Sequence, residues 1–209
     1  MPLVLTWLTG TVYAFWWFQV RDLRAFDQEQ MAEFQGEQLA ARLNTLLDVK
    51  AAFGDATSLS GRTVVFHFWN PDCQCNRFNT PHVKQIIDSY RDRGISFLTV
   101  IPPKAGQNDR QAIKQAREIF GVPAVVAHGI YEDNEAVPSA SPAAAVITAD
   151  RQLAYFGPYS EGAACGPSGG AFVENTLDAL IRGDTPQESN TLAFGCFCQW
   201  ADTHPSQVI

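Results

Sequence analysis

The segment from Thr63 to Arg93 most constrains what this chain of 209 residues can fold into. It reads TVVFHFWNPDCQCNRFNTPHVKQIIDSYRDR, which is an apolar strand, a short step that holds Cys73 and Cys75, and an amphipathic helix. A cysteine at a helix N-terminus meets unpaired backbone N–H groups and the positive end of the helix dipole, and both favour thiolate over thiol. The segment therefore predicts a thiol site held between a strand and a helix.

The residues that follow predict alternating strands and helices. Continuous apolar runs are typical of buried strands, asparagine caps helices, and glycine ends them. The predicted elements are a buried strand at 95–101, a helix between Asn108 and Gly121, a strand at 143–148 with a hairpin partner at 152–156, and a last helix from Phe172 to Gly183. The order of these elements is that of a single α/β domain.

The start of the chain predicts a membrane anchor. Residues 3–20 (LVLTWLTGTVYAFWWFQV) carry no charge and are barely long enough to cross a bilayer, and a tryptophan pair and two arginines suit its interface. We predict a single-pass inner-membrane anchor over residues 1–22, then an amphipathic helical stalk and linker over residues 23–58. The arginines would keep the body in the cytoplasm, whereas five cysteines favour an oxidising compartment, so we expect the soluble domain to be periplasmic.

Charge excludes one broad class of partner. The net charge is −7 and the isoelectric point is near 5.0, and the sequence contains no basic run. A general affinity for nucleic acid needs a basic surface. We therefore expect no nucleic-acid partner.

The order of elements around the cysteines resembles the thioredoxin fold, a central mixed sheet flanked by helices. The chain contains the run Phe68-Trp69-x-x-x-Cys73, and Pro81 follows eight residues after the cysteine. This run resembles the FWxxWCxxC…P pattern of membrane-anchored thioredoxin-like oxidoreductases of the redoxin and cytochrome-maturation type. Ser141-Pro142 resembles the cis-proline that faces the active-site cysteines in that superfamily. The resemblance implies a thioredoxin-like domain over residues 59–184.

The sequence looks closest to an uncharacterised proteobacterial thioredoxin-like family with a Cys-x-Cys site and a cysteine-bearing C-terminal tail, here residues 185–209. That closeness implies no known activity. The resemblance to thioredoxin-like oxidoreductases implies thiol–disulfide exchange, with Cys73 as the attacking thiolate, Cys75 as the resolving partner and Pro142 shaping the substrate groove. The expected partners are protein thiols or disulfides and a reductant or oxidant protein, and no cofactor is expected.

Three residues depart from the family pattern. Asn76 stands where the family has its second cysteine, and Asp72 replaces a tryptophan with a carboxylate that disfavours a thiolate beside it. His67 lies on the strand where thioredoxins often carry a buried acid. It is either a proton acceptor near neutral pH or a hydrogen-bonded core histidine, and the sequence leaves both open.

The remaining cysteines allow two interpretations. Cys165 lies in a glycine-rich stretch, and Cys196 and Cys198 form a second Cys-x-Cys step near the end of the chain. The tail cysteines are either a relay dithiol for the main site or a structural disulfide that fixes the tail to the domain. Five cysteines leave at least one unpaired in a monomer.

Two other functions remain as alternatives. Cys73 and Cys75 with a histidine, His128 or His82, would form a soft site for Cu(I), as in a copper metallochaperone, and the tail cysteines could add further thiolates. Alternatively, the cysteines are structural and the chain is a non-catalytic thioredoxin-like scaffold.

Overall fold

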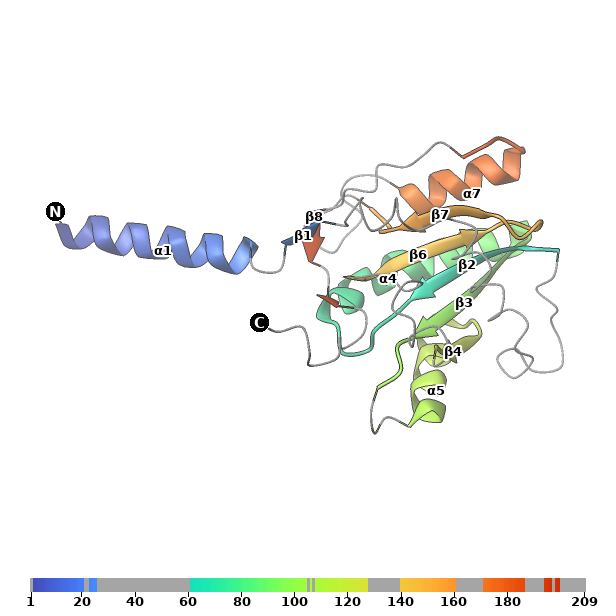
Figure 1. Cartoon of the computed structure of the whole chain (residues 1–209), viewed down its shortest axis with the longest axis horizontal. Coiled ribbons are helices and arrows are strands. Elements are labelled where there is room, and N and C mark those ends of the chain that lie inside the picture. Colours follow the sequence, from blue (N-terminus) through green and yellow to red (C-terminus); the bar gives the residue numbers. More distant parts are fainter. Residues whose placement is uncertain are drawn as a thin grey trace.

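The computed structural model describes residues 2–20, 23–25, 61–104, 106, 108–127, 140–160, 171–186, 194–196 and 198–199. Its body is a five-stranded mixed sheet in the order β4-β3-β2-β6-β7 (Figure 1). The strands are β2 (Thr63–Phe68), β3 (Ile95–Ile101), β4 (Ala124–Val126), β6 (Ala143–Ile147) and β7 (Leu153–Gly157). Strands β2, β3 and β4 are parallel to one another, whereas β6 is antiparallel to both of its neighbours.

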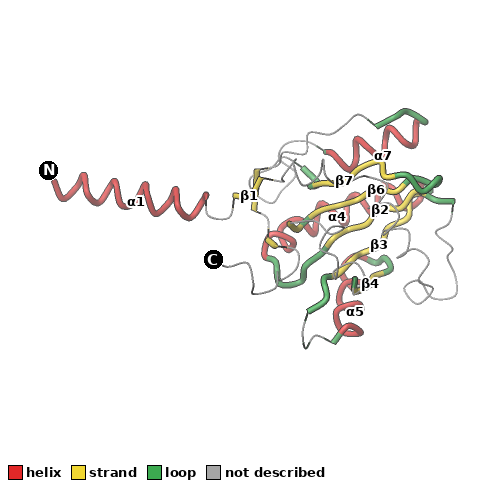
Figure 2. The backbone as a smooth tube through the Cα atoms, in the orientation of Figure 1, coloured by secondary structure: helices red, strands yellow, loops and turns green. Residues whose placement is uncertain are grey.

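Among the residues that the structure describes, three helices accompany this sheet: α4 (Gln74–Tyr90), α5 (Asp109–Phe120) and α7 (Phe172–Arg182). Helix α4 continues into one 3-10 turn, η3 (Arg91–Arg93). Figure 2 shows α7 beside β7 at one edge of the sheet and α5 beside β4 at the other. This topology confirms the predicted α/β thioredoxin-like fold, and strand β4 is the element of the sheet that the sequence did not predict.

Strand β2 lies at the centre of the sheet, between β3 and β6. Successive side chains of a strand point to opposite faces, and both faces of β2 are buried. Phe66 and Phe68 lie on one face, and Val65 and His67 lie on the other. Burial on both faces explains why this strand reads as a nearly continuous apolar run.

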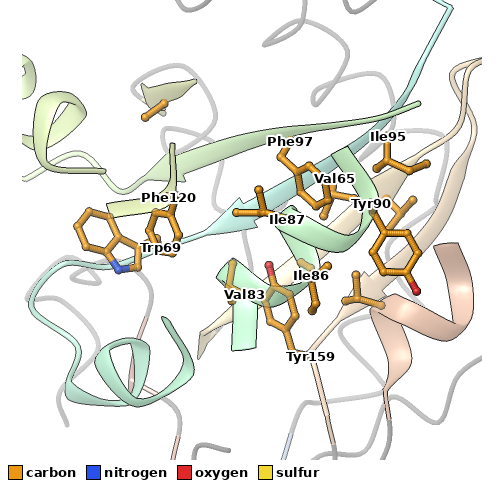
Figure 3. Close-up of a cluster of buried hydrophobic side chains, with 14 of the residues drawn as sticks. Val65, Trp69, Val83, Ile86, Ile87, Tyr90, Ile95, Phe97, Phe120 and Tyr159 are labelled. Atoms are coloured by element: carbon orange, nitrogen blue, oxygen red, sulfur yellow. The ribbon is translucent and has the colours of Figure 1, made fainter. Parts of the chain in front are cut away.

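The core cluster joins the Val65 face of the sheet to the three helices. In Figure 3 the α4 residues Val83, Ile86 and Ile87 point toward the sheet, and the Trp69 ring packs edge-on against Phe120 of α5, with 5.6 Å between ring centroids. Helix α7 contributes Phe172, Val173 and Leu177 to the same cluster. One apolar core therefore fixes the position of α4, whose first turn follows Cys73.

The first helix, α1 (Pro2–Val20), forms where an apolar helix was predicted and projects from the body (Figure 1). No helix in the described ranges is both long and apolar enough to span a bilayer, and the predicted anchor over residues 3–20 finds no support. Three threonines, a glycine and a glutamine dilute its apolar residues. The hydroxyls of Thr9 and Thr11 donate to carbonyl oxygens one turn earlier, those of Leu5 and Trp7.

Short strands pair segments from the two terminal regions with each other, and one tail strand pairs with β5 (Ala140–Ser141). Strand β1 (Leu23–Ala25) pairs antiparallel with β8 (Phe194–Cys196), and β5 pairs antiparallel with β9 (Cys198–Gln199). Of the helical stalk and linker predicted over residues 23–58, residues 23–25 form strand β1, and the rest lies outside the described residues, as does the glycine-rich segment that holds Cys165.

The packing of α4 on the sheet predicts a stability difference between two residues of that helix. Ile87 is 1% exposed and Phe78 is 66% exposed. Replacing Ile87 with alanine should lower the free energy of unfolding by about 2–5 kcal/mol, because the substitution leaves a cavity under the helix. Phe78→Ala should change it by about 0.5 kcal/mol or less. Urea unfolding of the full chain measures both, and equal losses would contradict this packing.

Candidate functional site

Cys73 lies at the junction of β2 and α4. It is the N-cap residue of α4, with extended backbone angles, and its side chain makes no capping hydrogen bond. The turn before it is fixed by Asn70, whose carbonyl oxygen accepts from the Cys73 N–H at 3.1 Å and whose Oδ1 accepts from the Asp72 N–H at 3.0 Å. The predicted position of Cys73 at a helix N-terminus is confirmed.

The sheet register brings a proline to the same point. Phe68, the last residue of β2, pairs with Ala143, the first residue of β6, so the residues before β6 lie beside those after β2. The Ser141–Pro142 peptide bond is cis, as the resemblance implied. The Cys73 Sγ lies 3.7 Å from the Ser141 carbonyl oxygen.

Cys73 is disulfide-bonded in this structure, and its residue is 4% exposed. Cys75 follows in the first turn of α4, but its side chain lies outside the described part of the structure. The predicted pairing of Cys73 with Cys75 therefore stays a prediction.

Asn76 connects the elements that form the site, a role that the sequence analysis missed. Its Nδ2 donates to the Asn70 carbonyl oxygen at 3.0 Å and to the Ser141 Oγ at 2.6 Å, and that hydroxyl donates to the Phe68 carbonyl oxygen at 3.0 Å. The signal for this role was its position, since Asn76 stands where the resembled family has a second cysteine. The polar network holds Ser141 beside Cys73.

The carboxylate next to Cys73 has a cationic partner. Lys104 Nζ lies 2.5 Å from Asp72 Oδ2, and both side chains are about half exposed or more. The ammonium group offsets the effect that the carboxylate alone would have on a nearby thiolate. An open pocket of about 320 Å³ lies beside the pair and is lined by Pro71, Asp72, Lys104, Gly106, Asn108 and Gln111, among others.

His67 lies in the core, on strand β2, which leads to the site. Its Nδ1 lies 2.8 Å from the Tyr159 hydroxyl, and its ring packs edge-on against Phe120. Burial lowers the pKa of His67 to about 3, so the imidazole is neutral at pH 7. Burial also raises the pKa of Tyr159 well above its usual value. These contacts favour the core-histidine interpretation over a proton acceptor that works near neutral pH.

The metal-binding interpretation finds no support among the described residues. They contain no group of three or more histidine, cysteine or acidic side chains placed to hold a metal ion. The Nε2 of His82 instead lies 2.6 Å from the Oε1 of Glu174 on α7. His128 lies outside the described residues, as does the side chain of Cys75.

Comparisons with known proteins show the fold of this chain and a family. A family model with the description "Domain of unknown function (DUF6436)" matches residues 44–200. No curated protein matches the chain.

Several solved structures are similar to this chain. A crystal structure of an uncharacterized conserved protein from Geobacillus kaustophilus has a TM-score of 0.55 at 19% identity, over 69% of this chain and 80% of that chain. A hypothetical protein from Sinorhizobium meliloti 1021 has a TM-score of 0.52 at 13% identity, over 67% and 79%. A solution structure of a thioredoxin-like protein in the oxidized form has a TM-score of 0.48 at 21% identity, over 63% and 87%.

The buried imidazole predicts a pH dependence of stability. The unfolded chain protonates His67 near pH 6.5 and the folded chain only near pH 3, so the unfolded state binds more protons between these values. Stability should therefore fall as the pH falls through this window. Between pH 7 and pH 5 the free energy of unfolding of the full chain should fall by about 2 kcal/mol more than that of His67→Gln, whose side chain does not titrate there. Urea unfolding at both values measures the difference, and parallel losses would contradict it.

Proposed function

The chain belongs to the family described as "Domain of unknown function (DUF6436)", and we propose that it performs thiol–disulfide exchange through Cys73. The observation that carries this proposal is the position of the Cys73 sulfur, at the N-cap of α4 and 3.7 Å from the carbonyl oxygen that precedes the cis-proline. The proposal also draws on the resemblance of the FWxxxC run to thioredoxin-like oxidoreductases.

The electrostatics around Cys73 support this chemistry. The first turn of α4 presents unpaired N–H groups and the positive end of the helix dipole to the N-cap sulfur, and the turn contains no acidic residue. A thiolate there is stabilised, and the thiolate is the form that attacks a disulfide. Lys104, paired with Asp72, offsets the negative charge of that carboxylate near the same end.

The reaction is an exchange of bonds between sulfurs. In the direction that reduces a client, the Cys73 thiolate attacks a client disulfide, an S–S bond forms between them, and one client sulfur leaves as a thiolate. The Cys75 thiolate then attacks Cys73 Sγ, which forms the protein disulfide and releases the second client thiolate. Two electrons pass from the protein to the client, and the reverse sequence oxidises a client dithiol.

Asn76 explains why the second sulfur has to come from another position. The residue three places after the N-cap faces Cys73 in the family pattern, and here it is a buried amide that bonds to Asn70 and Ser141. The resolving thiol must therefore be one of the other cysteines, and we assign it to Cys75, the nearest in sequence. The expected clients are protein thiols or disulfides.

We also propose that the domain works in an oxidising compartment, the periplasm. A disulfide at Cys73 and five cysteines in 209 residues support this location. Trapping thiols by acid quench and alkylation in the native cells should find most Cys73 oxidised. Finding Cys73 fully reduced would contradict the location.

The exchange chemistry predicts different losses for the two cysteines. In the full chain with Cys73→Ser, the rate of insulin reduction with dithiothreitol as electron donor should fall to the uncatalysed rate, because no thiolate remains at this position to attack. In Cys75→Ser the Cys73 thiolate should still attack insulin. The reaction should then stop at a mixed disulfide between Cys73 and insulin, which a gel shift without reductant detects.

Cys165→Ser is the matched control, since it removes a thiol that the proposal does not use. It should retain the activity of the unchanged chain. If Cys73→Ser is as active as the unchanged chain, Cys73 has no part in the mechanism. If the unchanged chain shows no exchange above the uncatalysed rate, the proposed function is wrong, and if the protein purified without oxygen also holds no metal, the scaffold interpretation is favoured.

A further inference from the structure

A strand from the C-terminal tail lies against the edge next to the attacking sulfur. Strand β5 consists of the two residues that precede Pro142, and its partner is β9. The pairing is antiparallel, with Ala140 opposite Gln199 and Ser141 opposite Cys198. Figure 1 shows the tail strands on the same side of the body as the start of α4.

The register places Cys198 one strand spacing from the residue that contacts Cys73. Facing residues in an antiparallel pair have Cα atoms about 4.5–5.5 Å apart. Ser141 faces Cys198 across this pair, and its carbonyl oxygen lies 3.7 Å from Cys73 Sγ. The backbone of Cys198 is therefore close to the sulfur that the proposed function uses.

The two tail cysteines have different backbone partners. Strand β8 places Cys196 opposite Leu23 of β1, whereas β9 places Cys198 opposite Ser141. The tail is thus paired at two positions on either side of residue 197. These registers distinguish Cys198 from Cys196 as the tail cysteine at the candidate site.

We infer that β9 is an internal client strand, and that Cys198 exchanges disulfides with Cys73. An extended peptide can bind a protein by adding a strand to an exposed edge, and β9 occupies the edge next to Cys73 in this way. A client peptide with a cysteine would need the same edge, so the tail and the client compete. This inference rests on the proposed function and adds a second partner for Cys73.

The exchange needs no external oxidant. The Cys198 thiolate attacks Cys73 Sγ of a Cys73–Cys75 disulfide, the Cys73–Cys198 bond forms, and Cys75 leaves as a thiolate. A client thiolate later attacks Cys73 Sγ in the same way, and Cys198 leaves as a thiolate together with β9. The low exposure of Cys73 in the disulfide-bonded structure fits a sulfur that is covered until the tail leaves.

The first experiment identifies the sulfur that bonds to Cys73 when Cys75 is absent. The full chain with Cys75→Ala is oxidised with a glutathione buffer, alkylated, digested and mapped by mass spectrometry. We expect a peptide pair that joins Cys73 to Cys198. A Cys73 that is linked to Cys165 or Cys196, bound to glutathione or unpaired would overturn the inference.

The second experiment releases the strand without removing a sulfur. Gln199→Pro removes a backbone N–H and disfavours the pairing with β5. Thr203→Pro is the matched control, because it makes the same substitution four residues later. If β9 covers the edge in about nine molecules of ten, Gln199→Pro should lower the KM for a disulfide-containing peptide about tenfold. An unchanged KM in Gln199→Pro would overturn the competition.

The two experiments separate this inference from the proposed function. The mass map does not require turnover, so it tests the Cys73–Cys198 bond even if the full chain has no activity toward insulin. If Cys73→Ser abolishes activity while the map lacks the Cys198 link, the proposed function stands and the inference fails. Should Gln199→Pro lose its native circular dichroism, a chain that ends at Thr191 replaces it and should show the same lowered KM.

Discussion

The hydrogen bonds of Ser141 hold the candidate site together. Its hydroxyl donates to the end of β2 at Phe68 and accepts from Asn76 in the first turn of α4, while its carbonyl oxygen contacts the sulfur of Cys73. Strand β2, helix α4 and strand β5 therefore meet at one buried side chain. Ser141 also provides the backbone edge that β9 pairs with, so the same residue links the sulfur to the tail. This buried network favours one arrangement, because moving any of the three segments would leave the Ser141 hydroxyl or the Asn76 Nδ2 without its partner.

The sequence predicted the elements whose side chains repeat regularly. Long apolar runs identified β2 and β3, the glycine at position 121 marked the end of α5, and the resemblance located the cis-proline. Strand β4 has three residues and the tail strands have two or three, which is too short for a period to appear. Pairings such as Ser141 with Cys198 join residues far apart in the chain, and no local pattern encodes them.

Single-residue roles were harder to predict than elements. Comparison with the family pattern showed that Asn76 stands in place of a cysteine. The hydrogen bonds that Asn76 donates to Asn70 and Ser141 form only when three segments of the chain fold together. His67 was left with two interpretations because its pKa depends on burial, which only the packed structure defines. The anchor prediction rested on the absence of charge over residues 3–20, whereas the threonines and the glutamine make α1 less apolar, and no described helix is long and apolar enough to span a bilayer.

The β1–β8 ladder couples the two ends of the chain. Leu23 faces Cys196 and Ala25 faces Phe194, so a residue close to α1 helps to hold the segment that continues into β9. Fragments that begin near residue 60, a natural choice for producing the sheet and its helices alone, would lose that ladder. Such a fragment would keep the tail sequence but not its fixed path, and its measured affinity for peptides would differ from that of the full chain.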